Sequence, residues 1–149
     1  MAKIRTPEEI KKKRLQGSFK QKAIFYQQAD FMKACGQTVD RNNTKQIDLY
    51  DSLIEEEYRE FRDAIAVSNE AEEADAAIDL IVVLIGYGLS RGWPMKKLWD
   101  EVMTSNMDKI DPATGKVKKR RDGKVLKPKD WMPPNIKDIL MRHKAKKKV

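Results

Sequence analysis

Cysteine and histidine are almost absent from this sequence, which contains one of each among its 149 residues. The single cysteine, Cys35, excludes a disulfide framework and a thiolate metal cluster within one chain. The single histidine, His143, falls in a lysine-rich tail, so we do not expect histidine-based catalysis or metal binding. Candidate chemistry therefore has to be sought among other side chains.

Long hydrophobic runs are also missing. The segment Met1–Arg5 is not followed by an apolar stretch of the kind found in secretory signals, so no such signal is expected. The apolar run from Ile78 to Leu89 is too short to cross a bilayer and is interrupted by Asp79 and two glycines. We expect a buried helix here, and a cytoplasmic protein with no membrane partner.

No strand pattern occurs in the first two thirds of the chain, which predicts an all-α helical bundle. The residues that indicate helix starts are Thr6-Pro7, Ser18, Asn43 or Thr44, and Pro94. The residues that indicate helix ends or breaks are Gly36, Val67-Ser68-Asn69, and the group Gly86, Gly88 and Gly92.

The last third of the chain has a different character. Two turn sequences, Asp111–Gly115 and Asp122-Gly123, predict a small hairpin or ordered loop beside the helices. A short final helix is expected from Ile136 to Met141. We interpret residues 1–149 as a single domain, with a basic N-terminal segment (1–17) and a flexible basic tail (142–149).

Charge is distributed unevenly along the chain, whose net charge is +8. Acidic residues dominate from Asp48 to Asp79, whereas eight lysines and arginines fall between Lys116 and Lys129. A polyanion that binds together with a divalent cation would suit both segments, and a nucleoside triphosphate is such a molecule. Nucleic acid is the other candidate ligand.

Two groups of carboxylates occur at helical spacing. Glu57 and Glu60 are three residues apart and share one helix face. Glu72 and Asp75 repeat this spacing, and Asp79 lies one turn further on. Each group flanks an apolar stripe, and we expect the two stripes to pack together. The stripes consist of Ile54, Tyr58, Phe61 and Ile65 on the first helix, and of Ile78, Ile81, Val82 and Ile85 on the second.

Packing of these stripes would bring the carboxylates together at the border of the core. Like charges at close range repel and lose solvation unless a cation neutralises them. Oxygen ligands in this number suit Mg²⁺ or Mn²⁺, which bind a few carboxylates together with substrate phosphates. The alternative is a pair of surface helices whose acidic faces are simply solvated.

Aromatic and amide side chains lie close together on the helix expected after Ser18. Gln28 and Phe31 could hydrogen-bond and stack on a nucleobase. Aromatic stripes on helices are more often part of the core, so this interpretation stands beside a purely structural one.

The spacing Glu57-x-x-Glu60 followed by Glu72-x-x-Asp75 resembles the metal-binding signature of the MazG-like all-α nucleoside triphosphate pyrophosphohydrolases. Relatives in that group include phosphoribosyl-ATP pyrophosphohydrolase and the dimeric dUTPases. A longer pattern is similar to the phosphoribosyl-ATP-pyrophosphohydrolase-like proteins common in bacteriophages, and the resemblance covers about residues 25–136. The pattern comprises Asp79-Leu80-Ile81-Val82-Val83-x-x-Gly86, Gly92-Trp93-Pro94, Glu101 to Lys109, Asp122 to Pro128, and Pro133-Pro134.

This resemblance implies roles for individual residues. The metal ligands, for Mg²⁺ with Mn²⁺ as a substitute, would be Glu57, Glu60, Glu72 and Asp75, with Asp79 as an extra or supporting ligand. The phosphate-binding residues would be Asn106, Lys109, Lys124 and Lys127. Glu56 is the candidate for orienting or deprotonating the attacking water, and Glu55 is an alternative. Family members form homodimers or homotetramers, and a neighbouring subunit would complete the site.

The implied reaction is Mg²⁺-dependent hydrolysis of a nucleoside triphosphate between its α- and β-phosphates, giving a monophosphate and pyrophosphate. A purine deoxynucleotide such as dATP or dGTP is the expected substrate, in a phage-like protein that shapes a deoxynucleotide pool. Phosphoribosyl-ATP hydrolysis is the alternative within the family. A small basic nucleic-acid-binding helical protein is the alternative from another class, and it leaves the matched carboxylates without a purpose.

Overall fold

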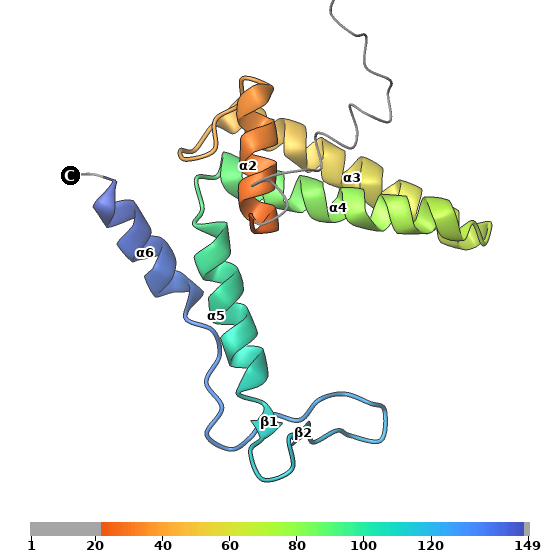
Figure 1. The fold of residues 1–149 in the computed structure, drawn as a ribbon, viewed down its shortest axis with the longest axis vertical. Helices are drawn as coiled ribbons and strands as arrows, with labels where there is room; N and C mark the ends of the chain where they lie inside the picture. Colours follow the sequence, from red (N-terminus) through yellow and green to blue (C-terminus); the bar gives the residue numbers. More distant parts are fainter. Residues whose placement is uncertain (1–21, 148–149) are drawn as a thin grey trace, which may run out of the picture. The chain divides into compact units, whose positions relative to one another are not determined.

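The computed structural model describes residues 22–147. They form α2 (Ile24–Ala34), α3 (Thr44–Ala66), α4 (Glu70–Ser90), α5 (Met95–Met107), β1 (Ile110–Asp111), β2 (Lys116–Val117) and α6 (Ile136–Lys146), as Figure 1 shows. The predicted all-α fold with a small C-terminal hairpin is confirmed. The helix start expected at Thr6-Pro7 and the basic segment 1–17 lie outside the described residues.

The described residues belong to two compact units, which divide between Gly92 and Trp93. The first contains α2, α3 and α4, and the second contains α5, the small sheet and α6. The single-domain interpretation stays a prediction. Within residues 22–147, none of the helices combines the length and the apolar character needed to cross a membrane.

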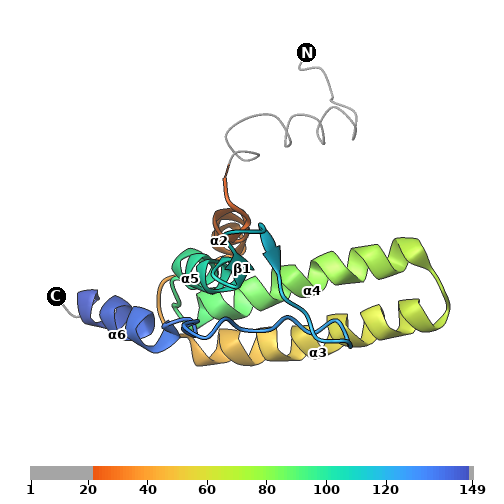
Figure 2. The same cartoon turned by 90° about the horizontal axis from the view of Figure 1, so that it is seen from below.

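The first unit is built on a long antiparallel helix hairpin, α3–α4 (Figures 1 and 2). Asn43 caps α3 by accepting a hydrogen bond from the backbone N–H of Gln46, as the sequence predicts. Asn69 caps α4 in the same way, through the N–H of Glu72. Ser68, at φ 54°, takes a left-handed conformation between the helices. The chain therefore reverses in three residues, and the two helices run side by side.

Buried polar contacts fix the register of this hairpin. The amide nitrogen of Gln46 donates to the hydroxyl of Ser90 at 2.7 Å, and this hydroxyl donates to the backbone carbonyl of Gly86 at 2.7 Å. Gln46 also donates to the carbonyl of Thr38 at 2.7 Å, which ties the preceding loop to the hairpin. Buried amides that lose a partner cost stability, so a slipped register is disfavoured.

Gly86 marks a close approach of the two helices. A Cβ atom at this position would lie 2.1 Å from Cε1 of Tyr50, whose side chain is buried and donates a hydrogen bond to Gln37. The glycines at 86 and 88 therefore do not end α4, as the sequence suggested, but lie within it. Only Gly92, at φ +68°, follows the helix end in a conformation that favours glycine.

We expect Gly86→Ala to destabilise the protein by about 1–3 kcal/mol, because the added methyl group overpacks the contact with Tyr50. Urea unfolding monitored by circular dichroism would measure the loss. In a Tyr50→Leu background, the same substitution should cost markedly less. An equal cost in both backgrounds would show that the ring of Tyr50 does not determine the close approach.

The packing face of the hairpin differs from the predicted stripes. Tyr58 and Ile65 of α3 are exposed, as are Ile78 and Ile81 of α4, so these four assignments were wrong. The inward positions of α4 include Ala76, Val83, Gly86 and Ser90, most of which are small. Because α4 is apolar almost all round, periodicity does not reveal which face packs. Small side chains select the face by allowing the helices to approach closely.

Helix α2 covers part of α4 in the first unit. Its inward residues are Phe25, Gln28, Ala29 and Met32, and Met32 is completely buried. The helix ends before Gly36, which has a φ of +73° and stops it as predicted. Residues 18–21, where the sequence placed the start of this helix, lie outside the described residues.

In the second unit, later segments of the chain pack back against α5. The β1–β2 pair is antiparallel, and a second turn at Arg120–Lys124 brings Lys119 opposite Val125. Helix α6 continues to Lys146, so the prediction that it ends at Met141 and that residues 142–149 form a flexible tail was wrong for residues 142–146. Lysine, arginine and alanine favour helix, and basic side chains in the last turn complement the helix dipole.

Candidate active site

Glu57 occupies a position on α3 where an apolar residue would ordinarily pack. The half-buried or buried positions of α3 on this side are Tyr50, Ile54, Phe61 and Ala64, and Glu57 falls among them at helical spacing. The sequence-based prediction placed Glu57 beside the packing stripe. In the structure, the packing face of α3 includes the position of Glu57, which is half-buried.

The hairpin register shows what lies opposite Glu57. Gln46 pairs with Ser90, and Glu57 follows Gln46 by eleven residues while Asp79 precedes Ser90 by eleven. In an antiparallel hairpin, equal steps in opposite directions keep two residues level, so Glu57 and Asp79 lie at the same height. Glu60 is then level with Ala76, one residue from Asp75.

Electrostatics agrees with this register. The pKa of Glu57 is raised, mainly by loss of solvation and then by the charges of Asp79, Glu60, Glu56 and Asp75. These neighbours come from both helices, so the charges of four carboxylates act on Glu57. Loss of solvation and the neighbouring like charges both disfavour the ionised form of Glu57, a combination that is frequent at functional sites.

Among the predicted metal ligands, Glu72 lies farthest along the hairpin from Glu57. The register places it level with Ala64, seven residues beyond Glu57 on α3, which is about 10 Å along the helix axis. Its charge does not contribute to the pKa shift of Glu57. Glu72 is exposed near the start of α4, where its backbone N–H is capped by Asn69. Asp79, which sequence reasoning gave a supporting role, lies closer to the centre of the cluster.

The donor set of this cluster fits a hard divalent cation. Glu57, Glu60, Asp75 and Asp79 offer only carboxylate oxygens, which are the ligands that Mg²⁺ and Mn²⁺ prefer. Within residues 22–147, no three ligand-type side chains converge closely enough to hold an ion in the arrangement seen. The fit therefore rests on the chemistry of the donors and on the charge repulsion at Glu57, which a divalent cation would relieve.

The predicted phosphate-binding residues lie in the second unit. The amide oxygen of Asn106 accepts a hydrogen bond from the ammonium group of Lys109 at 2.8 Å. The ammonium groups of Lys109 and Lys127 both lie against the ring of Trp131, at 5.1 and 4.1 Å from its centroid. Three of the four predicted residues are thus gathered in one place. Lys124 is exposed in the Arg120–Lys124 turn.

Trp131 is a residue that sequence reasoning missed. Tryptophan is a preferred partner for cations, and Trp131 follows a lysine-rich segment, so the sequence does contain a signal for this contact.

The two residues suggested for base binding differ in burial. Gln28 is buried against the hydroxyl of Tyr50, whereas Phe31 is 61% exposed. Gln28 therefore belongs to the core, and only Phe31 is open to a ligand.

Comparison with known proteins places this arrangement in a family. Residues 30–106, just over half of the chain, match the family described as phosphoribosyl-ATP pyrophosphohydrolase. The match includes α3 and α4 with all the clustered carboxylates, and it ends at Asn106, before Lys109, Lys127 and Trp131. No curated protein matches the chain. The chain belongs to the phosphoribosyl-ATP pyrophosphohydrolase family, a family of hydrolases that act on phosphoric anhydrides.

Proposed function

We propose that this protein is a Mg²⁺-dependent nucleoside triphosphate pyrophosphohydrolase that releases pyrophosphate and a nucleoside monophosphate. The observation that carries the proposal is the group of carboxylates around Glu57, contributed by both helices of the hairpin. Membership of a pyrophosphohydrolase family supports the class of reaction. The lysines gathered at Trp131 supply cationic partners for a polyphosphate.

In this proposal, Glu57, Glu60, Asp75 and Asp79 hold magnesium, which when bound withdraws charge from the phosphates and acidifies a bound water. Glu56, whose charge is felt at Glu57, is the candidate for accepting the proton of the attacking water. Lys109 and Lys127 bind phosphate oxygens and offset the negative charge that builds up on the departing pyrophosphate. Asn106 orients Lys109 through their hydrogen bond.

The proposed substrate is a deoxynucleoside triphosphate, with a purine base such as that of dATP or dGTP, in a phage-type protein that adjusts a deoxynucleotide pool in the cytoplasm. Phe31, exposed on α2, is the side chain available to stack on a base. Phosphoribosyl-ATP is the alternative substrate, and it is the one that gives the family its name.

We further propose that the protein acts as a homodimer or homotetramer. Ile78, Ile81 and Leu84 are 46–60% exposed at successive three-residue steps, so they lie on one side of α4. A second copy that covers this exposed apolar strip would remove it from water, which favours the oligomer.

Size-exclusion chromatography with light scattering would measure the mass of the particle, and a monomer at micromolar concentration would contradict this part of the proposal.

A panel of ribo- and deoxynucleoside triphosphates, with phosphoribosyl-ATP included, tests the function. Each is incubated with Mg²⁺, and pyrophosphate, free phosphate and the nucleotide product are measured separately. Pyrophosphate with monophosphate from one or two deoxynucleotides would support the proposal. Diphosphate with free phosphate would contradict the proposed bond, and turnover of phosphoribosyl-ATP alone would identify the alternative substrate.

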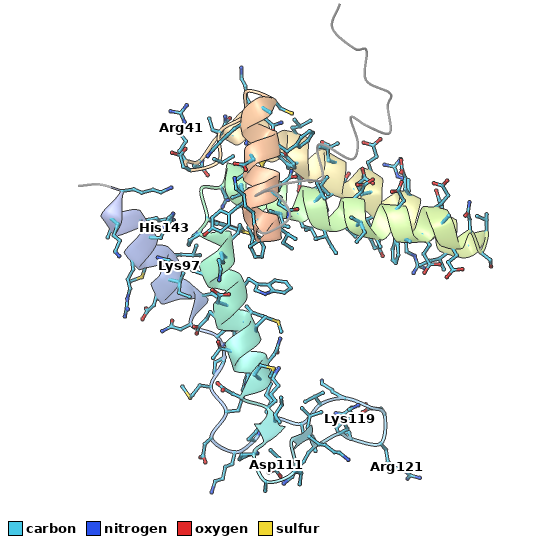
Figure 3. The ribbon with its side chains drawn as sticks, in the orientation of Figure 1. Arg41, Lys97, Asp111, Lys119, Arg121 and His143 are labelled. Carbon is cyan, nitrogen blue, oxygen red and sulfur yellow. The ribbon has the colours of Figure 1, made fainter. Side chains whose placement is uncertain are left out.

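One observation favours a second function, binding of nucleic acid by the α5–α6 surface. A pocket of about 630 Å³ between these helices is lined by Lys97, Arg142, His143 and Lys146, and Figure 3 shows Lys97 and His143 near each other.

A labelled single-stranded oligonucleotide should bind to this surface with an affinity that falls about 10–100-fold between 50 and 200 mM salt. Arg142→Glu with Lys146→Glu should abolish this binding, and absence of binding by the wild type at 50 mM salt would exclude the function.

A further inference from the structure

Trp131 joins segments of the second unit that are far apart in the sequence. Its indole N–H donates to the backbone carbonyl of Ser105 on α5, at 2.7 Å. The hydroxyl of Ser105 donates in turn to the backbone carbonyl of Met132 at 3.1 Å, and Ser105 is buried. Three residues further on, the N–H of Asn135 donates to the carboxylate of Glu101 at 2.8 Å. Three hydrogen bonds therefore hold the returning segment against α5 and fix the indole ring.

The ring fixed in this way holds two flexible cations. Lys109 follows the end of α5, and Lys127 follows the Arg120–Lys124 turn, yet both ammonium groups lie within 5.1 Å of the same ring centroid. The two ammonium groups carry like charges and contact one ring, and the electron-rich indole offsets only part of their repulsion. An anion with several charges would offset the rest. A pocket of about 230 Å³ borders the same two lysines.

We propose that Trp131 is a positioning residue that gathers Lys109 and Lys127 into a binding site for the phosphate chain of the substrate. This proposal rests on the proposed function and adds a residue outside the part of the chain that matches the family. A lysine is a long side chain with much rotamer freedom, so holding it near its working position reduces the entropy lost on binding. The contact with the ring is weak enough to yield to a charge-assisted bond with phosphate.

The role of the ring can be separated from the role of its N–H by two substitutions. Trp131→Phe keeps an aromatic face for the lysines and removes the hydrogen bond to Ser105. Trp131→Leu removes both. We expect Trp131→Leu to raise KM about tenfold with a smaller decrease in kcat, and Trp131→Phe to restore most of the wild-type KM. A circular dichroism melt of each variant shows that it folds. Wild-type KM in a folded Trp131→Leu variant would overturn the proposal.

A binding experiment tests the site without relying on turnover. Replacing Trp93 and Trp99 by phenylalanine leaves Trp131 as the sole tryptophan, and inorganic triphosphate is the probe. Withdrawal of the lysines toward phosphate should change the emission of Trp131 in a saturable way. The change should disappear in a Lys109→Ala, Lys127→Ala variant. It should persist in a Lys119→Ala, Arg121→Ala variant, which removes the same charge from the exposed loop labelled in Figure 3.

The outcomes distinguish this proposal from the proposed function. Saturable emission change by triphosphate without hydrolysis of any nucleotide would support the positioning role and refute the activity. Hydrolysis of nucleotides with no emission change, or with a change that survives loss of both lysines, would overturn the positioning role and leave the activity intact.

Discussion

Glu57→Gln is expected to reduce kcat by about 10³-fold or more while leaving the fold at least as stable as that of the wild type. Several kcal/mol of charge stabilisation disappear when a central metal ligand is lost. The neutral amide also removes the repulsion that Glu57 experiences from Asp79, Glu60, Glu56 and Asp75. Steady-state pyrophosphate release in the presence of Mg²⁺ measures the change in kcat. Thermal unfolding of the metal-free and of the Mg²⁺-saturated protein measures the change in stability.

The pH dependence of stability provides the control for this prediction. Because the fold raises the pKa of Glu57, ionisation of this group disfavours the folded state. The associated stability is present below the pKa of the unfolded chain and is lost as pH rises through the higher folded pKa. Glu57→Gln should remove this loss from the metal-free protein. A lower Tm for Glu57→Gln than for the wild type at neutral pH would contradict the crowding of carboxylates.

Asp79→Asn and Glu72→Gln should differ strongly in activity, although both positions carry acids on α4. Asp79 is level with Glu57, so its loss should reduce kcat by about 10²–10³-fold. Glu72 lies about 10 Å further along the hairpin, and its loss should reduce kcat less than about fivefold. Parallel kinetics of the two variants with the same nucleotide would measure the difference.

This comparison decides between two ligand sets. The spacing in the sequence favours Glu72 with Asp75, whereas the hairpin register favours Asp75 with Asp79. Inactivity of Glu72→Gln combined with near-normal turnover of Asp79→Asn would show that the first set is correct. Circular dichroism of both variants would verify that any loss of activity is not a loss of folding.

Much of the fold could be predicted from local signals. Asn43 as a cap, the break at Val67–Asn69 and the stop at Gly36 are short-range features, and each agrees with the structure. The extent of α6 was underestimated because a run of basic residues suggested a flexible tail, although lysine and arginine are good helix formers.

The faces of α3 and α4 could not be predicted in the same way. Long-range contacts determine them, above all the approach of Tyr50 to Gly86 and the hydrogen bond from Gln46 to Ser90. Neither contact is visible in periodicity, because α4 is apolar on nearly every side. The same contacts set the register that places Asp79 level with Glu57, which spacing in the sequence does not reveal.

The arrangement of the proposed phosphate-binding residues could be predicted in part from the sequence. Asn106 lies in the last turn of α5 and Lys109 follows the helix end, three residues further on, so their contact follows from spacing. The meeting of Lys109 with Lys127 depends on the path of the chain between them, which includes a hairpin and a second turn. Both lysines lie against Trp131, a contact that emerges only from the folded arrangement.

The most direct test of the carboxylate cluster is a titration with Mn²⁺, in which the electron paramagnetic resonance signal reports the free ion. The proposed metal site predicts saturable binding to the wild type and to Glu72→Gln, and loss of that binding in Glu57→Gln and Asp79→Asn. Wild-type affinity in Glu57→Gln, or loss of binding through Glu72→Gln alone, would contradict a metal site centred on Glu57 and Asp79.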